Sequence, residues 1–194
     1  SGSSCANYVT NGGFENGWLQ PWKIVGARSG GLPGWTVTQG DIDFGNYNTG
    51  GHCNRKPCAH GGQALLDICG YSRGAIAQTV STVPNNAYVL TLAYDAHAGT
   101  CTNENLVVKM DVVIDGKRVE RLRHKNEYTW DLDWAFFRHE FVASGNSVTL
   151  EFKSLDDGCG CGEVNRQCGA RIRWCNKFDS PRFLLIFLLS YNEN

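Results

Sequence analysis

Short strand-type segments separated by tight turns run through most of this sequence and restrict the folds open to it. The segments are rich in Val, Ile, Thr and aromatic residues, and polar and apolar positions alternate along them as in half-buried strands. Asp115-Gly116 is the clearest turn, because it separates the Val-rich segment 106–114 from its predicted hairpin partner 117–122. No segment has the apolar spacing of an amphipathic helix. The pattern predicts an all-β protein of roughly eight to ten short strands, folded as an antiparallel β-sandwich or barrel.

The last apolar segment, Phe183 to Leu189, is far shorter than the ~20 residues that a membrane-spanning helix needs. We therefore predict a last buried strand there and no membrane span. The other predicted strands are 35–38, 41–44, 63–69, 74–80, 88–94, 106–114, 117–122, 134–142 and 148–152.

The length of the chain limits the number of domains, and its net charge limits the kinds of partner. A chain of 194 residues is long enough for one substantial domain, and a second full domain would be cramped. We predict a single sandwich domain over residues 1–174, followed by a C-terminal extension, 175–194. The formal net charge of -1 gives no basic field that would attract nucleic acid, so nucleic acid is not an expected partner.

Nine cysteines, most of them in Gly- and Asn-rich segments, predict disulfide bonds and a secreted, extracellular protein. Cys53 and Cys58 lie in the polar segment 46–62, where we expect them to close a small loop. With His52 and His60 they also have the residue types of a zinc site, but thiols in an oxidising compartment tend to be bridged, so the disulfide is preferred. The odd number leaves one cysteine that is free or pairs with another chain.

The segment Asn11-Gly12-Gly13-Phe14-Glu15 combines a turn, a core anchor and a carboxylate. Gly12 and Gly13 permit backbone angles that other residues avoid, so we expect a sharp turn there before Phe14 enters the core. We expect Glu15 to lie beside backbone carbonyl groups, and carboxylate and carbonyl oxygens together are ligands for calcium. The alternative is a plain first strand in which Glu15 faces water.

A calcium ion usually needs about six to eight oxygen ligands, so other acids would have to join Glu15. The candidates are Asp41, Asp43 and Asp156. If Arg171 or Arg173 points toward Glu15 instead, its guanidinium would pair with the carboxylate and take the place of the metal.

The aromatic residues near predicted turns are candidates for sugar binding. A flat ring in a loop can stack on the apolar face of a sugar, while neighbouring polar groups bond the hydroxyls. We expect only one or two of these rings to face a ligand and the others to belong to the core, as we predict outright for Trp35. The candidates are Trp18, Trp22, Tyr47, Tyr71, Trp130 and Trp134.

Catalytic motifs are missing from the sequence, so we predict that the protein is not an enzyme. There is no Gly-x-Ser-x-Gly elbow, no His-Glu-x-x-His motif and no phosphate-binding loop. A glycosidase would need two carboxyl groups that face one another across a cleft. Asp131, Asp133, Asp156 and Asp157 have the right chemistry for such a pair, but we expect them to be turn residues beside strands.

The order of several short motifs resembles the galactose-binding-like jelly rolls over residues 9–172. The nearest resemblance is to plant cell-wall proteins of unknown function with this fold and to carbohydrate-binding modules attached to xylanases. The motifs are Asn11-Gly12-Gly13-Phe14-Glu15, Pro33-Gly34-Trp35, His60-Gly61-Gly62-Gln63-Ala64-Leu65, Ala77-Gln78-Thr79-Val80 followed by Ala87-Tyr88-Val89-Leu90, and Cys168-Gly169-Ala170.

This resemblance implies a secreted jelly-roll sandwich with a structural calcium near Glu15, a disulfide between Cys101 and Cys168, and glycan binding without catalysis. Where such families carry an acid soon after the Cys-Gly pair, this chain has Arg171 and Arg173. We expect a lectin-like, carbohydrate-binding module of a cell wall, coat or extracellular matrix. One rival is a structural or adhesive matrix protein that binds other proteins or itself, through the unpaired cysteine or the C-terminal tail. A second is a sandwich-fold glycoside hydrolase or lyase.

Overall fold

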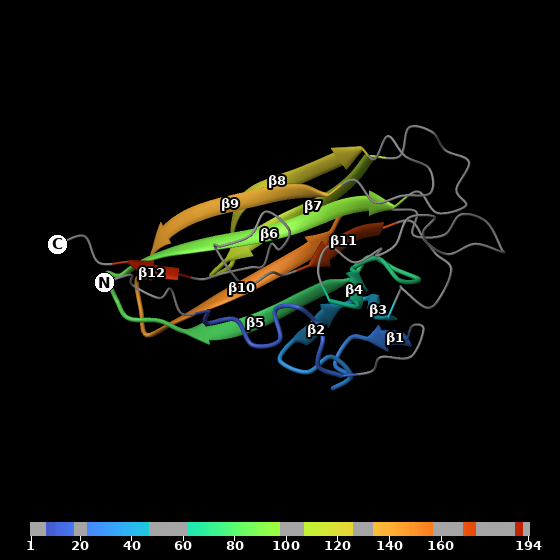
Figure 1. The fold of residues 1–194 in the computed structure, drawn as a ribbon, viewed down its shortest axis with the longest axis horizontal. Helices are drawn as coiled ribbons and strands as arrows, with labels where there is room; N and C mark the ends of the chain where they lie inside the picture. Colours follow the sequence, from blue (N-terminus) through green and yellow to red (C-terminus); the bar gives the residue numbers. More distant parts are fainter. Residues whose placement is uncertain are drawn as a thin grey trace.

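Two antiparallel sheets face each other in this chain (Figure 1). The computed structural model describes residues 7–17, 23–46, 62–97, 107–125, 134–156, 169–173 and 189–191. Every regular element in these ranges is a β-strand, and every strand pairing is antiparallel. The prediction of an all-β, antiparallel fold is therefore confirmed.

The larger sheet has seven strands, and β6 is the strand next to its β9 edge. Its strands are β1 (Lys23–Gly26), β3 (Asp41–Asn46), β4 (Ala64–Asp67), β11 (Gly169–Arg173), β6 (Ala87–His97) and β12 (Leu189–Tyr191), in that order, with β9 (Ala135–Val142) paired to β6. The smaller sheet has five strands. They are β2 (Thr36–Gln39), β5 (Ala75–Ser81), β10 (Ser147–Ser154), β7 (Val107–Ile114) and β8 (Lys117–Lys125), in that order.

The predicted hairpin at Asp115-Gly116 is confirmed, since β7 and β8 pair directly across this turn. Both residues have positive φ angles, 47° and 76°, as a two-residue hairpin turn requires. At the other end of the chain, β12 pairs with β6 inside the predicted extension 175–194, so this part of the extension belongs to the larger sheet. Within the described ranges we find no helix with the length and apolar content needed to cross a membrane.

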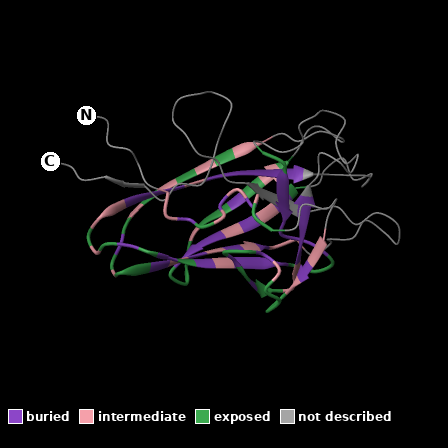
Figure 2. Ribbon diagram, turned by 60° about the horizontal axis from the view of Figure 1, so that its bottom comes forward, coloured by how far each residue is buried: buried purple, intermediate pink, exposed green. Residues whose placement is uncertain are grey.

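Apolar side chains fill the space between the sheets, and buried and exposed positions alternate along the strands (Figure 2). The alternation is regular in β10, where Val148, Leu150 and Phe152 are buried. The core position predicted for Trp35 is confirmed: its ring is 5% exposed and lies 5.9 Å from the ring of Phe14 and 6.0 Å from that of Phe152.

The N-terminal turn differs from the prediction in its backbone. Positive φ angles occur at Asn11 (49°) and Phe14 (56°), whereas Gly12 and Gly13 are not among the residues with positive φ. The amide of Phe14 donates to the carbonyl oxygen of Asn11, which closes the turn at 3.1 Å. Phe14 is fully buried, so packing of its ring holds a backbone conformation that non-glycine residues rarely adopt.

A buried glutamine ties this N-terminal turn to the smaller sheet. Gln78 in β5 is 8% exposed, and its side chain accepts a hydrogen bond from the amide of Thr10 at 2.7 Å. The same side chain donates to the carbonyl oxygens of Thr10 (2.9 Å) and Gly34 (2.6 Å). One amide group therefore satisfies three backbone groups from two segments distant in the sequence.

Replacing Gln78 by Ala should destabilise the fold, because it leaves these backbone groups without their partner. We expect a loss of about 1–3 kcal/mol in the free energy of unfolding, measured by urea denaturation. Ser81→Ala, at an exposed position of the same strand, is the matched control and should change stability by less than about 0.5 kcal/mol. Equal losses in the two variants would contradict this role for Gln78.

Candidate functional site

Strand register brings three acids into one row across the larger sheet. Asp43 in β3 lies opposite Asp67 in β4, and Arg171 in β11 is paired in register with both Asp67 and Asp95 of β6. Residues directly opposite one another share a face, so this row lies on the face turned away from the core. Asp43, Asp67 and Asp95 are nevertheless 5%, 1% and 0% exposed. The row thus alternates buried carboxylates with one arginine position.

A histidine from the smaller sheet contacts the end of this row. The Nε2 atom of His124 in β8 lies 3.1 Å from Oδ1 of Asp95, and the same oxygen accepts the amide of Ala96 at 2.7 Å. The His124 ring also meets the ring of Tyr94 edge-on at 5.9 Å. Burial, with the nearby carboxylate of Glu120 as a second cause, raises the pKa of Tyr94. This contact links the two sheets at one end of the sandwich.

Asp41 organises the turn after β4. Its carboxylate accepts hydrogen bonds from the amides of Tyr71 and Ser72 at 2.5 and 3.1 Å, and from the Ser72 hydroxyl at 3.1 Å. The chain must approach closely here: a Cβ on Gly40 (φ +52°) would meet the carbonyl oxygen of Arg73 at 2.1 Å. The turn holds the side chain of Tyr71 outward, where it is 51% exposed.

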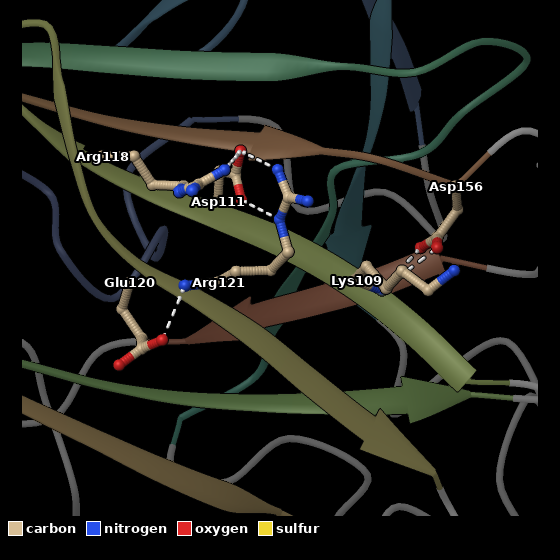
Figure 3. A network of polar contacts seen from close by, with 6 residues as sticks. All are labelled: Lys109, Asp111, Arg118, Glu120, Arg121 and Asp156. Carbon is tan, nitrogen blue, oxygen red and sulfur yellow. Dashed lines mark hydrogen bonds and ion pairs between the residues drawn. The ribbon is translucent and has the colours of Figure 1, made fainter.

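Asp156 follows the end of β10, and its carboxylate holds backbone there as that of Asp41 does in the turn after β4. Its carboxylate accepts the amide of Lys109 at 3.0 and 3.3 Å (Figure 3). Burial raises the pKa of Asp156, and this effect outweighs the lowering by the Lys109 amide and by the charges of Lys109 and Arg73. The backbone oxygen of Asp156 lies 3.8 Å from Sγ of Cys69, which is disulfide-bonded.

These contacts place five acids around one end of the sandwich, where β6, β8 and β10 end and β7 and β9 begin. We call it the acidic end. It comprises Asp41, Asp43, Asp67, Asp95 and Asp156. Four of these carboxylates accept backbone amide bonds close to a strand end. Hydrogen bonds from fixed backbone donors thus hold four of the five carboxylates of the acidic end in place.

Asp111 in β7 has a pKa shift opposite to that of Asp156. Its two oxygens accept Nε and Nη2 of Arg121 at 2.7 and 3.0 Å, and Arg118 lies 3.9 Å away (Figure 3). The hydrogen bonds from Arg121 hold the pKa of Asp111 below its ordinary value. This ion pair joins β7 to β8 on the solvent side of the smaller sheet.

Two aromatic residues continue from the acidic end along β9. Ala135 packs against the core, so its neighbours Trp134 and Phe136 face away from it. Trp134 is half-buried, whereas Phe136 is 56% exposed and lies opposite the small residue Ala93. Since Ala135 pairs with Tyr94, Trp134 comes level with Asp95. We call Trp134 and Phe136 the aromatic strip.

Beyond the aromatic strip, the same face of β9 carries charged groups. Arg138 and Glu140 form an ion pair with each other, and their side chains are 61% and 46% exposed. Phe136 is a residue that the sequence analysis missed, because only Trp and Tyr residues near turns were considered. A visible signal was its position in the alternation of 134–142, where an aromatic residue occupies a place expected to be polar.

Of the aromatic residues predicted to bind sugar, the structure describes Tyr71 and Trp134. Both lie at the acidic end, on separate elements: Tyr71 follows β4 and Trp134 precedes β9. The other predicted residues lie outside the described ranges, and so do the four cysteines of the predicted disulfides. These residues are Trp18, Trp22, Tyr47, Trp130, Cys53, Cys58, Cys101 and Cys168.

The four predicted calcium ligands are divided between two places. A Cβ on Gly70 would lie 2.4 Å from Oδ1 of Asp41 and 3.2 Å from Oδ1 of Asp43, so these two acids are neighbours, and Asp156 belongs to the same end. Glu15 instead accepts the amides of Gln63 and Ala64, the start of β4, at 3.0 and 3.2 Å.

These two contacts of Glu15 are to N–H donors, and the carbonyl groups expected beside it stay a prediction. Amide donors suit a carboxylate but supply no oxygen ligand to a cation. In the described part of the chain, no three His, Cys, Asp or Glu side chains converge as a metal site would require. Arg171 is in register with Asp67 and Asp95 rather than with the segment around Glu15. Calcium binding stays a prediction.

Comparison with known proteins gives a family match and several distant structural similarities. Residues 7–164 match the family described as "Protein of unknown function (DUF642)". No curated protein matches the chain significantly.

Similar solved structures include TmCBM61 in complex with β-1,4-galactotriose, at 14% identity and a TM-score of 0.47, with 96% of this chain and 99% of that chain covered. The CBM22-1 xylan-binding domain of Paenibacillus barcinonensis Xyn10C is 12% identical, with a TM-score of 0.43 and 99% and 100% coverage. A CBM4 structure is 11% identical, with a TM-score of 0.44 and 94% and 99% coverage. Similarity at this level does not identify a ligand.

The two carboxylates with opposite pKa shifts should give opposite pH dependences of stability. The pKa of Asp156 is raised, so its contribution is fully present below the ordinary carboxyl pKa and is lost as pH rises through the raised value. The pKa of Asp111 is lowered, so its contribution is present above the ordinary pKa and is lost as pH falls through the lowered value.

Urea denaturation of Asp156→Asn and Asp111→Asn across the acidic pH range would measure these contributions. With rising pH, Asp156→Asn should gain stability relative to the unsubstituted protein, whereas Asp111→Asn should lose it. Parallel curves for both variants would contradict the burial of Asp156 as the dominant effect.

Proposed function

This chain belongs to the DUF642 family of proteins of unknown function, and we propose that it is a secreted, lectin-like protein of jelly-roll type that binds cell-wall carbohydrate. The aromatic strip of β9 is the observation that carries this proposal. Phe136 exposes a large apolar ring on the face of β9 that is turned away from the core, so packing in the core does not explain this residue. A sugar ring has an apolar face that stacks on such a surface.

Exposed polar groups beside the aromatic strip supply the hydrogen bonds that sugar hydroxyls need. On the same face of β9, Arg138 and Glu140 present a donor and an acceptor beside Phe136. Aromatic rings beside one positively charged donor and one negatively charged acceptor suit a neutral, hydroxyl-rich ligand rather than a strongly charged one.

The hydrogen bonding at the acidic end supports binding rather than catalysis. A glycoside hydrolase uses one free nucleophile or base and one acid with a raised pKa across a cleft. Asp156 has a raised pKa, but its candidate partners Asp41, Asp67 and Asp95 each accept backbone amides, which is the setting of carboxylates that hold turns and strand ends. We therefore propose that this protein recognises its sugar without cleaving it.

The cysteines support secretion. Nine cysteines in 194 residues are many for a chain kept in a reducing compartment, and Cys69 is disulfide-bonded. Placement in the cell wall follows from the proposed ligand and from the resemblance to plant cell-wall proteins.

Removing either ring of the aromatic strip should weaken carbohydrate binding. For Trp134→Ala and Phe136→Ala we expect at least a roughly tenfold rise in Kd, because a stacked aromatic contact contributes about 0.5–1.5 kcal/mol beyond the area it buries. Affinity electrophoresis against soluble wall polysaccharides, with xylan and β-1,4-galactan in the panel, identifies the ligand, and calorimetry then gives the Kd.

Tyr71→Ala is the matched control, because it removes another exposed ring from the acidic end but not from β9. Its Kd should stay close to that of the unsubstituted protein. Binding that survives both substitutions in the aromatic strip and is lost in Tyr71→Ala would move the site to the turn after β4. Failure to bind any polysaccharide in the panel would contradict the proposed function.

A further inference from the structure

Strand β9 is the terminal strand of the larger sheet within the described residues. It pairs with β6 from Ala87↔Val142 to Tyr94↔Ala135, while β11 and β12 pair with the opposite edge of β6. A terminal strand presents a row of backbone donors and acceptors along its outer edge, to which another strand can be added.

The sequence of β9 is chemically symmetric about His139. Arg138 and Glu140 stand one residue on either side of it, and Phe137 and Phe141 stand two residues away. Phe136 and Val142, three residues away, are 56% and 63% exposed. An antiparallel copy of this strand, centred on His139, would therefore find an opposite charge or an apolar residue at each of these positions.

We propose that β9 is the edge through which two copies of this chain pair, with His139 opposite His139 of the second copy. Arg138 then faces the second copy's Glu140, and the same ion pair occurs twice by symmetry. Phe137 faces the second copy's Phe141 on the core side, and Phe136 faces the second copy's Val142 on the open side. The two seven-stranded sheets become one continuous sheet.

Charge complementarity distinguishes β9 from the terminal strand of the smaller sheet. Strand β8 carries mostly cations, and a second copy paired to it would set cation against cation, which protects an edge from self-pairing. These cations are Lys117, Arg118, Arg121, Arg123 and Lys125. The remaining terminal strands, β1 and β2, have only four residues each and offer short edges. Among the terminal strands that the structure describes, β9 alone combines length with self-complementary charge.

Arg138 and Glu140 can exchange their ion pair within one chain for ion pairs between the two copies at little cost. Arg138 and Glu140 already pair within one chain, but both are exposed, and such pairs contribute little in one molecule. In the dimer each group gains a partner across the strands. Only one strand per copy is covered, so the dimer should be weak and concentration-dependent.

A dimer of this kind would also make the proposed sugar site bivalent. A two-fold axis perpendicular to the continuous sheet places both aromatic strips on the same face, so one polysaccharide chain or two neighbouring chains can engage both copies. The strand pairing itself does not depend on the proposed function, and it is tested without sugar.

Sedimentation velocity of the full chain over a range of concentrations tests the pairing. We expect a reversible monomer–dimer equilibrium whose Kd rises at least tenfold in Glu140→Arg and in Arg138→Glu, since each single substitution sets like charges opposite one another. The double variant R138E/E140R restores opposite charges across the dimer and should return the Kd to within about threefold of the original.

Lys117→Glu is the matched control, because it reverses an exposed charge on β8 and should leave the equilibrium unchanged. Equal melting temperatures confirm that the variants are folded. A chain that stays monomeric at all concentrations, a dimer unaffected by the single substitutions, or a double variant that does not recover would overturn the proposal. So would a dimer that separates only on addition of reductant, since that result assigns the contact to a cysteine.

Discussion

The alternation of side chains along β6 is the constraint on which the rest of this structure depends. β6 pairs with β9 along one edge and with β11 and β12 along the other, so its register decides which residues of these strands face the core. Tyr88, Leu90 and Leu92 are fully buried and belong to the core between the sheets. A shift of one residue would turn them outward and turn Asp95 inward. The acid row and the aromatic strip both follow from this alternation.

The fold accommodates several buried carboxylates at the acidic end because backbone amides donate hydrogen bonds to them. A buried charge without partners is costly, and hydrogen bonds from backbone amides offset that cost. Asp41 and Asp95 accept such bonds where the chain turns or a strand ends, and His124 adds a contact from the other sheet.

The sequence predicts local features of this fold well and long-range ones poorly. The Asp115-Gly116 hairpin and the burial of Trp35 depend on nearby residues or on strong hydrophobicity, and both are confirmed. The row of Asp43, Asp67 and Asp95 depends on pairings between strands that are not consecutive, and composition does not reveal them. In the N-terminal turn, packing of Phe14 overrides the glycine preference, so the positive φ angles fall on Asn11 and Phe14.

Recognition of a sugar at the aromatic strip is the central claim, and a crystal structure of the protein with a bound oligosaccharide tests it most directly. The oligosaccharide should come from the polysaccharide that binds most tightly. The account predicts a sugar ring stacked on Phe136 or Trp134, with hydroxyls bonded to Arg138 or Glu140. A sugar bound at the turn that carries Tyr71, or on the open face of the five-stranded sheet, with both β9 rings free of it, would contradict the account.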